Sequence, residues 1–153
     1  MSTIKPIDWS DDLNIGVPEI DIQHRKLVQL FNDSLKWMNA SSSLAGWETI
    51  VYEFLAYALY HFHTEEELAN KYGYGMNDPV HALSHHEEHE AFLAHFKATQ
   101  ASLKSGKSIS TLDIVTFIHN WLINHIGHDD MPLGEFIRAK RANSMPLAPQ
   151  PGQ

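Results

Sequence analysis

The sequence predicts an all-α protein, an antiparallel up-down four-helix bundle with an irregular N-terminal arm. Apolar residues recur at steps of three and four along four segments, which is the pattern of one buried helix face. Short breaks rich in glycine, proline and serine separate these segments, and short links favour antiparallel neighbours. No stretch alternates apolar and polar residues over a useful length, so we expect no β-sheet.

We divide the chain into three regions. Residues 1–19 are expected to form the arm, whose apolar side chains can lie across the bundle. Residues 20–142 are expected to form the bundle. Residues 143–153 are rich in proline and are expected to be a flexible tail.

The helices can be placed from their apolar stripes and their terminal residues. Pro79 suits the first turn of a helix, and Ser110 is a plausible N-cap. Glycines after residue 72 end the second helix. The expected helices are at about 19–39, 44–72, 79–104 and 111–126, with a shorter helical piece at 133–142.

Composition excludes several classes of function. The chain has 153 residues, 43% of them hydrophobic, which is enough for one domain with a buried core. Its formal charge of −8 argues against nucleic acid or an anionic membrane surface as a partner. The absence of cysteine excludes disulfides, zinc–thiolate sites and iron–sulfur clusters. No signal peptide or membrane-spanning run is visible, so we expect a cytoplasmic protein without membrane insertion.

Six polar residues lie on the apolar stripes and should point into the bundle. A lone histidine there is ordinarily a core residue with a hydrogen-bond partner, but a buried ionised carboxylate is costly. Five buried imidazoles would need as many separate partners, whereas two divalent metal ions could bind them all. Imidazole and carboxylate without thiolate suit iron. The six are His24, His61, Glu65, His85, His89 and His125.

Two pairs have the spacing of one helical turn. His61 and Glu65 are four residues apart, and so are His85 and His89, so each pair can converge on one centre. His81 is four residues before His85, which leaves His81/His85 as an alternative pair. We prefer His85/His89.

His125 and Asp130 are five residues apart and would diverge by about 140° on a continuous α-helix. Gly127 between them and Pro132 after them suggest that the helix ends there. The chain would then turn Asp130 back toward the interior, and this turn would need the glycine.

The other ionisable residues are expected to face solvent. Glu90 is a possible hydrogen-bond partner of a metal ligand. The expected solvent-facing residues are His63, His86, His95, His119, His128, Glu66, Glu67, Glu87, Glu88 and Glu90.

Four motifs, in this order, resemble those of the hemerythrins, and specifically of the bacterial single-domain hemerythrins. They are DIQH, HFHTE, HHEEH and NHIGHDD, and the resemblance covers about residues 7–140. It implies two non-haem iron ions joined by a bridging oxo or hydroxo group. By this resemblance, His85, His89 and His125 would hold one iron and His24 and His61 the other, with Glu65 and Asp130 bridging both.

The resemblance also implies the activity. Two six-coordinate irons offer twelve positions; the seven residues fill nine and a bridging oxygen two, which leaves one position open on the two-histidine iron. Reversible binding of dioxygen for storage, transport or delivery to an O2-consuming enzyme would follow. Residues that match the family's apolar pocket are Leu27, Phe62, Trp121, Leu122 and Ile126.

The chain departs from the family pattern at two places. The link GYGMNDPVHALS, at residues 73–84, is longer than usual. Ala69 stands where a methionine is often found. Both could alter access to the site.

The sequence leaves three other functions open. The first is a di-iron oxidase, peroxidase or nitric-oxide-handling enzyme, although oxygen-activating bundles are typically richer in carboxylates. The second is an O2 or iron sensor that acts through a partner. The third is a metal-free structural bundle. We favour an oxygen-binding metalloprotein that is not an enzyme.

Overall fold

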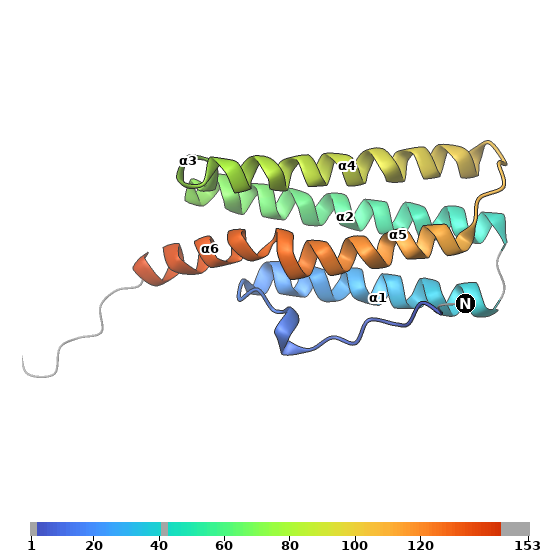
Figure 1. The fold of residues 1–153 in the computed structure, drawn as a ribbon, viewed down its shortest axis with the longest axis horizontal. Helices are drawn as coiled ribbons and strands as arrows, with labels where there is room; N and C mark the ends of the chain where they lie inside the picture. Colours follow the sequence, from blue (N-terminus) through green and yellow to red (C-terminus); the bar gives the residue numbers. More distant parts are fainter. Residues whose placement is uncertain (1–2, 41–42, 145–153) are drawn as a thin grey trace, which may run out of the picture.

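The computed structural model describes residues 3–40 and 43–144, and all regular structure in these ranges is helical (Figure 1). The helices are α1 (Pro18–Ala40), α2 (Leu44–Tyr72), α3 (Tyr74–Asn77), α4 (Pro79–Lys104), α5 (Thr111–Asn124) and α6 (Met131–Ser144). A short 3-10 helix, Asp11–Leu13, lies in the N-terminal segment, and a π-helical turn, His125–Asp129, joins α5 to α6. The expected tail begins at residue 143, and its residues 145–153 lie outside the described residues.

The four long helices α1, α2, α4 and α5 lie side by side, and each runs opposite to the one before it (Figure 1). Helix α2 contacts α1 and α4, and α1 also contacts α5. The predicted antiparallel up-down four-helix bundle is therefore confirmed. No helix within the described ranges is long and apolar enough to cross a bilayer.

The helix ends follow the local sequence. Gly73 adopts a left-handed conformation, φ 78°, and ends α2. The Asp78 carboxylate accepts the backbone N–H of His81 at 3.3 Å and caps α4, with Pro79 in the first turn. Ser110 caps α5 as predicted. Helices α2 and α4 have their predicted bounds, while α1 begins one residue earlier than expected.

The helix after α5 differs from the prediction. We expected the helix to end near Gly127, but α5 continues into the π-helical turn. The backbone N–H of Asp130, directly after this turn, donates to the carbonyl of His125 at 3.0 Å. A π turn brings residues five apart onto one face, so no glycine-dependent turn is needed. A Cβ at Gly127 would meet no atom within 4 Å. Helix α6 follows at once and begins before the predicted residue 133.

Two side chains of α1 hold the N-terminal segment against the bundle. The carboxylate of Asp21 accepts the backbone N–H groups of Ile15, at 2.7 Å, and of Gly16, at 3.1 Å. Further back, the amide of Asn32 both donates to and accepts from the backbone of Ile7, at 2.9 Å in each direction. These contacts fix the path of the segment along α1 from Asp21 to Asn32.

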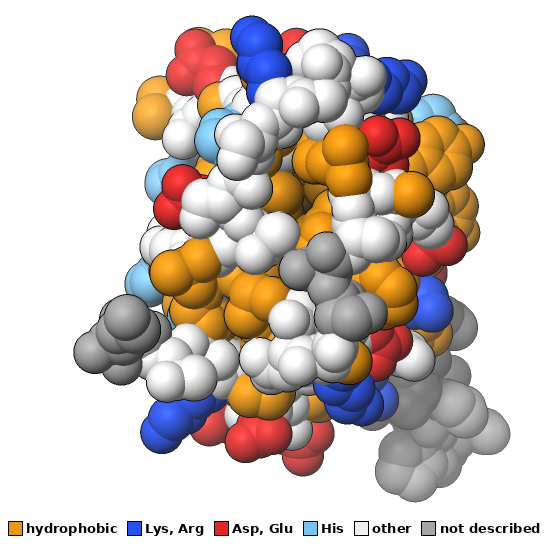
Figure 2. Space-filling model, turned by 90° about the vertical axis from the view of Figure 1, so that its right-hand side faces the viewer, with side chains coloured by type: hydrophobic (Ala, Val, Ile, Leu, Met, Phe, Trp, Pro, Cys, Tyr) orange, Lys and Arg blue, Asp and Glu red, His pale blue; other side chains and the backbone are white. Residues whose placement is uncertain are grey.

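The core has two apolar clusters with a polar layer between them. Along α1, Ile20 belongs to the smaller cluster and Leu27 to the larger one, and His24 lies between them. The smaller cluster includes α6 residues and Tyr74 of α3. At the opposite end of the bundle, apolar side chains are visible at the surface among the helix ends (Figure 2).

Candidate metal centre

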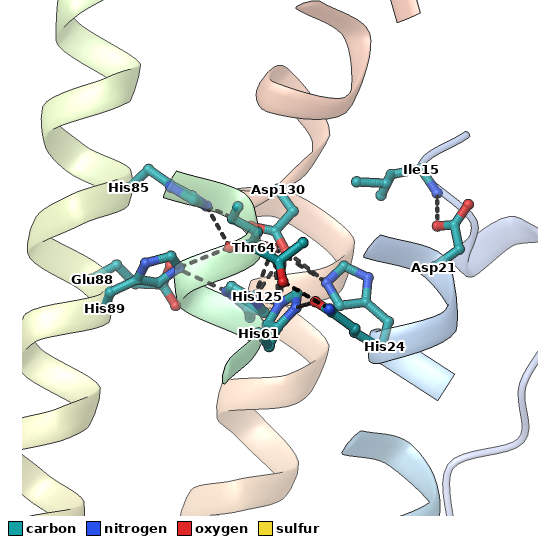
Figure 3. Close-up of polar contacts among 12 residues, drawn as sticks. Ile15, Asp21, His24, His61, Thr64, His85, Glu88, His89, His125 and Asp130 are labelled. Atoms are coloured by element: carbon teal, nitrogen blue, oxygen red, sulfur yellow. Dashed lines mark hydrogen bonds and ion pairs between the residues drawn. The ribbon is translucent and has the colours of Figure 1, made fainter. Parts of the chain in front are cut away.

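The polar layer contains all seven sequence-predicted ligands. They come from α1, α2, α4 and the π-helical turn with the residue after it, and their side chains converge inside the bundle. Figure 3 shows the histidines and Asp130 of this group. Six of the seven are at most 1% exposed, and His85 is 7% exposed. The seven are His24, His61, Glu65, His85, His89, His125 and Asp130.

The seven side chains form two overlapping groups of possible ligand atoms, each within 4.8 Å of one another, and Glu65 and Asp130 belong to both. Asp130 Oδ2 lies 2.7 Å from His24 Nε2, and its Oδ1 lies 2.6 Å from His85 Nε2. Glu65 Oε1 lies 2.8 Å from His61 Nε2, and its Oε2 lies 3.0 Å from His89 Nε2. Each carboxylate therefore presents one oxygen to each group.

His125 stands between the two groups. The resemblance assigns it to the same iron as His85 and His89, yet its Nε2 lies 2.9 Å from His61 Nε2 and 2.9 Å from Asp130 Oδ2. The geometry thus groups His125 with His24 and His61, and it also places His125 in a third group with His89 and Glu88.

The donor atoms fit a bound metal. Both oxygens of Glu65 and Nε2 of His89 are buried without a hydrogen-bond partner, although imidazole nitrogens lie close to that carboxylate. Buried polar atoms without partners are costly and uncommon in native proteins. A set of nitrogen and oxygen donors with no sulfur suits a divalent transition metal such as iron.

Charge pairing keeps both carboxylates ionised. Burial by itself would raise the pKa of Glu65, but the positive charges of His61 and His125 hold it well below its ordinary range. Burial and the Glu65 charge would also raise the pKa of Asp130, and His125 opposes them, so that this pKa too is low. Burial acts to lower the pKa of His85, but hydrogen bonds to Asp130 and Glu65 raise it to about 10. The pKa values of His24 and His125 are raised as well, so metal binding should release protons from these three histidines.

Two residues outside the seven contact the far sides of the imidazole rings. His61 Nδ1 lies 2.9 Å from the side-chain oxygen of Gln23, and His125 Nδ1 lies 3.4 Å from Glu88. Glu90, which we expected to face solvent and named as a possible partner, is exposed; Glu88, which we also expected to face solvent, is half-buried and takes that place. We did not predict Gln23, although its spacing from Ile20 puts it at the edge of the α1 stripe.

The carboxylate of Glu88 has a second neighbour. Burial, followed by the charge of Glu88 and a hydrogen bond to it, raises the pKa of Asp129 to about 6. The two acids lie on the outer side of His125, toward solvent.

The five residues predicted to line an oxygen pocket belong to the larger apolar cluster, next to the polar layer. The ring of Phe62 stacks on His89 with centroids 3.8 Å apart, and Trp121 stacks on His125 at 4.4 Å. Leu27, Leu122 and Ile126 are buried in the same cluster. Aromatic and aliphatic groups thus shield one side of the site from water.

The remaining histidines are separate from the cluster. His63, His86, His95 and His128 are exposed as expected, while His119 is half-buried beside Phe31. His81 is exposed and its Nδ1 lies 2.7 Å from the Asp78 carboxylate. Because it faces outward, the alternative His81/His85 pair does not form.

The fold and the site define a four-helix bundle with a buried histidine–carboxylate cluster of the metal-binding kind. Residues 15–137 match the family model of the hemerythrin HHE cation binding domain. The chain belongs to the hemerythrin family.

Curated relatives and solved structures agree with this. The chain is 32% identical over 131 residues to a bacteriohemerythrin of Stenotrophomonas maltophilia, which covers 86% of this chain and 81% of that protein. It is 31% identical over 126 residues to a hemerythrin-like protein of Naegleria gruberi, covering 82% and 89%. A crystal structure of wild-type hemerythrin superposes with a TM-score of 0.76 at 22% identity, covering 86% of this chain and 97% of that one. The structural likeness supports the fold.

Proposed function

We propose that this protein binds dioxygen reversibly at a non-haem di-iron centre, for storage, transport or delivery to an O2-consuming enzyme. The observation that carries the proposal is the pair of shared carboxylates, Glu65 and Asp130, each with one oxygen toward each of two histidine groups. Such sharing suits two metal ions held close together. The names of the bacteriohemerythrin relatives support iron as the metal.

The chemistry of the ligands favours oxygen binding over oxygen activation. Five histidines and two carboxylates form the site, whereas di-iron bundles that activate oxygen carry more carboxylates and Glu-x-x-His pairs. When bound, two ferrous ions would supply the electrons that a bound dioxygen takes up and returns on release.

The surrounding protein would protect such a centre. Phe62 and Trp121 cover the rings of His89 and His125 and keep water from that side of the site. A water-poor pocket limits the loss of protons and the side reactions that would make oxygen binding irreversible. We therefore propose a binding protein and not an enzyme. The cytoplasmic location stays a prediction.

The decisive experiment is a reversible colour change. Protein loaded with Fe²⁺ under argon should be nearly colourless, gain a visible band in air and lose it again under argon, with about two irons per chain. A colour that never reverses would favour an oxidase or peroxidase, and zinc or one metal per chain would contradict the di-iron assignment.

A variant pair makes the test specific. His61→Ala should abolish the band because this imidazole lies in the cluster, whereas His63→Ala should leave it unchanged because His63 is exposed on the same helix. Equal spectra for the two variants would show that His61 is only a core residue.

A further inference from the structure

A cavity of about 230 Å³ opens beside the metal centre, between α2 and α4 and next to α3. Helix α3 belongs to the long link between α2 and α4 (Figure 1). Its lining combines small residues with metal-binding side chains: Glu66, Ala69, Asn70, Tyr74, Gly75, Ala82, His85 and His86. The predicted departures of this chain from the family, the long link and Ala69, thus border one cavity.

The cavity reaches the metal centre at His85. This side chain lines the cavity and is 7% exposed, whereas each of the other six residues of the cluster is at most 1% exposed. His85 Nε2 in turn contacts both shared carboxylates, at 2.6 Å to Asp130 and 3.2 Å to Glu65. A cation that arrives at His85 is therefore already beside both shared carboxylates.

A carboxylate and an imidazole lie together at the outer part of the same cavity. Glu66 Oε1 lies 3.6 Å from His86 Nδ1, and these side chains are 46% and 57% exposed. The same Glu66 oxygen lies 3.8 Å from Nδ1 of the buried His89, an atom without a hydrogen-bond partner. Carboxylate and imidazole are the donors that divalent transition metals prefer, so suitable ligands run from the surface to His85.

The cavity is large enough for a hydrated ion. Ala69 of α2 and Ala82 of α4 line it with single methyl groups, and Gly75 adds no side chain. Six water molecules occupy roughly 180 Å³ at about 30 Å³ each. An ion can therefore enter with most of its water and exchange that water for protein ligands in steps.

We propose that this cavity is the route by which a divalent metal ion reaches the centre. Glu66 and His86 take the hydrated ion from solvent, and His85 is the first buried ligand to receive it. The inference rests on the metal-binding function proposed above, but it concerns the rate of loading and not the final occupancy.

The test measures how fast the apoprotein takes up Fe²⁺ under argon. Quenching of tryptophan fluorescence should report uptake, since Trp121 stacks on His125. The double variant Glu66→Ala/His86→Ala should load about tenfold more slowly at low metal concentration, the scale of electrostatic focusing on association rates. Its final metal content should equal that of the natural sequence.

The chain offers a matched control. His63 and Glu67 form another exposed pair of an imidazole and a carboxylate, here on α2. Their side chains lie 3.1 Å apart and are 68% and 70% exposed, and neither lines the cavity. His63→Ala/Glu67→Ala removes the same charge and should load at the original rate. If this control slows loading equally, the effect is one of overall charge and the route is wrong.

A second variant tests the cavity without a change in charge. Ala69→Met should fill part of the space and slow loading severalfold while leaving the final metal content unchanged. Original rates in both this variant and the Glu66/His86 variant would overturn the route even if two metals bind. A natural sequence that takes up no metal would instead overturn the function on which the route depends.

Discussion

The ring Nδ1–H of His61 is donated to the side-chain oxygen of Gln23 at 2.9 Å. The amide group of Gln23 donates in turn to Thr64 Oγ1 at 2.8 Å, and the Thr64 hydroxyl donates to the carbonyl of Tyr60 at 3.2 Å. Because the hydroxyl proton of Thr64 is already donated, Thr64 can only accept a hydrogen bond from Gln23. The Gln23 side-chain amide therefore has one favourable orientation, with its NH2 group toward Thr64. The chain of bonds holds His61 with Nε2 toward the cluster.

Gln23 should therefore support metal binding without touching the metal. Gln23→Ala should weaken Fe²⁺ affinity by about 10- to 100-fold, the usual effect of losing a partner that orients a metal ligand. Competition with a chelator under argon measures this. Gln29→Ala is the control, since Gln29 is exposed on the same helix and should leave the affinity unchanged. Equal affinities for the two variants would exclude a positioning role for Gln23.

Asp130 should be needed for both metals. Asp130→Asn should reduce the metal content from two per chain to less than one, because each of its oxygens faces a different histidine group. Asp129→Asn, the same change one residue earlier, should keep two metals, since Asp129 lies in neither group that contains Asp130. Elemental analysis after loading distinguishes them. Loss of only one metal in Asp130→Asn would argue against a shared ligand.

Gly127 should be replaceable and Gly16 should not. Gly127→Ala should be neutral or stabilise by about 0.5–1 kcal/mol, because the position is helical and a Cβ meets nothing within 4 Å. Gly16→Ala should destabilise by about 1–2 kcal/mol, since Gly16 has φ 83° and its Cβ would lie 2.5 Å from Arg138 Cδ. Urea unfolding measures both. Strong destabilisation by Gly127→Ala would instead support the glycine-dependent turn predicted from the sequence.

The ion pair between Glu19 and Arg141 should make a small, pH-dependent contribution to stability. It ties α6 to α1, with Arg141 also donating to the Tyr72 hydroxyl. The hydrogen bond from Arg141 lowers the pKa of Glu19 below 4.5. The stabilisation is thus present above the unfolded-state pKa and is lost as the pH falls through the folded-state pKa.

Glu19→Gln should therefore lower the free energy of unfolding at pH 7 by no more than about 1 kcal/mol, because the pair is partly exposed. The difference from the natural sequence should shrink as the pH falls below about 4.5. Urea unfolding at several pH values tests this. A difference that stays constant with pH would mean that packing, and not charge, links these helices.

The sequence alone was enough to predict the bundle and its inward polar residues. The bounds of α2 and α4 follow from Gly73, Pro79 and the stripe of residues at steps of three and four. The same spacing put the paired histidines and Glu65 on buried faces, because the positions four residues apart on a helix must share a face. Periodicity is a local property of the sequence, so the buried faces of the helices can be predicted from it without any tertiary contact.

The tertiary structure decided what local spacing cannot express. The π-helical turn that carries Asp130 inward is one of several helix geometries open to this segment, and Gly127 does not indicate which one forms. The roles of Gln23 and Glu88 depend on which side chain of another helix lies opposite each imidazole. The sequence by itself determined which residues could bind a metal; only the packing of the helices determined their partners, the position of His125 between the groups and the opening at His85.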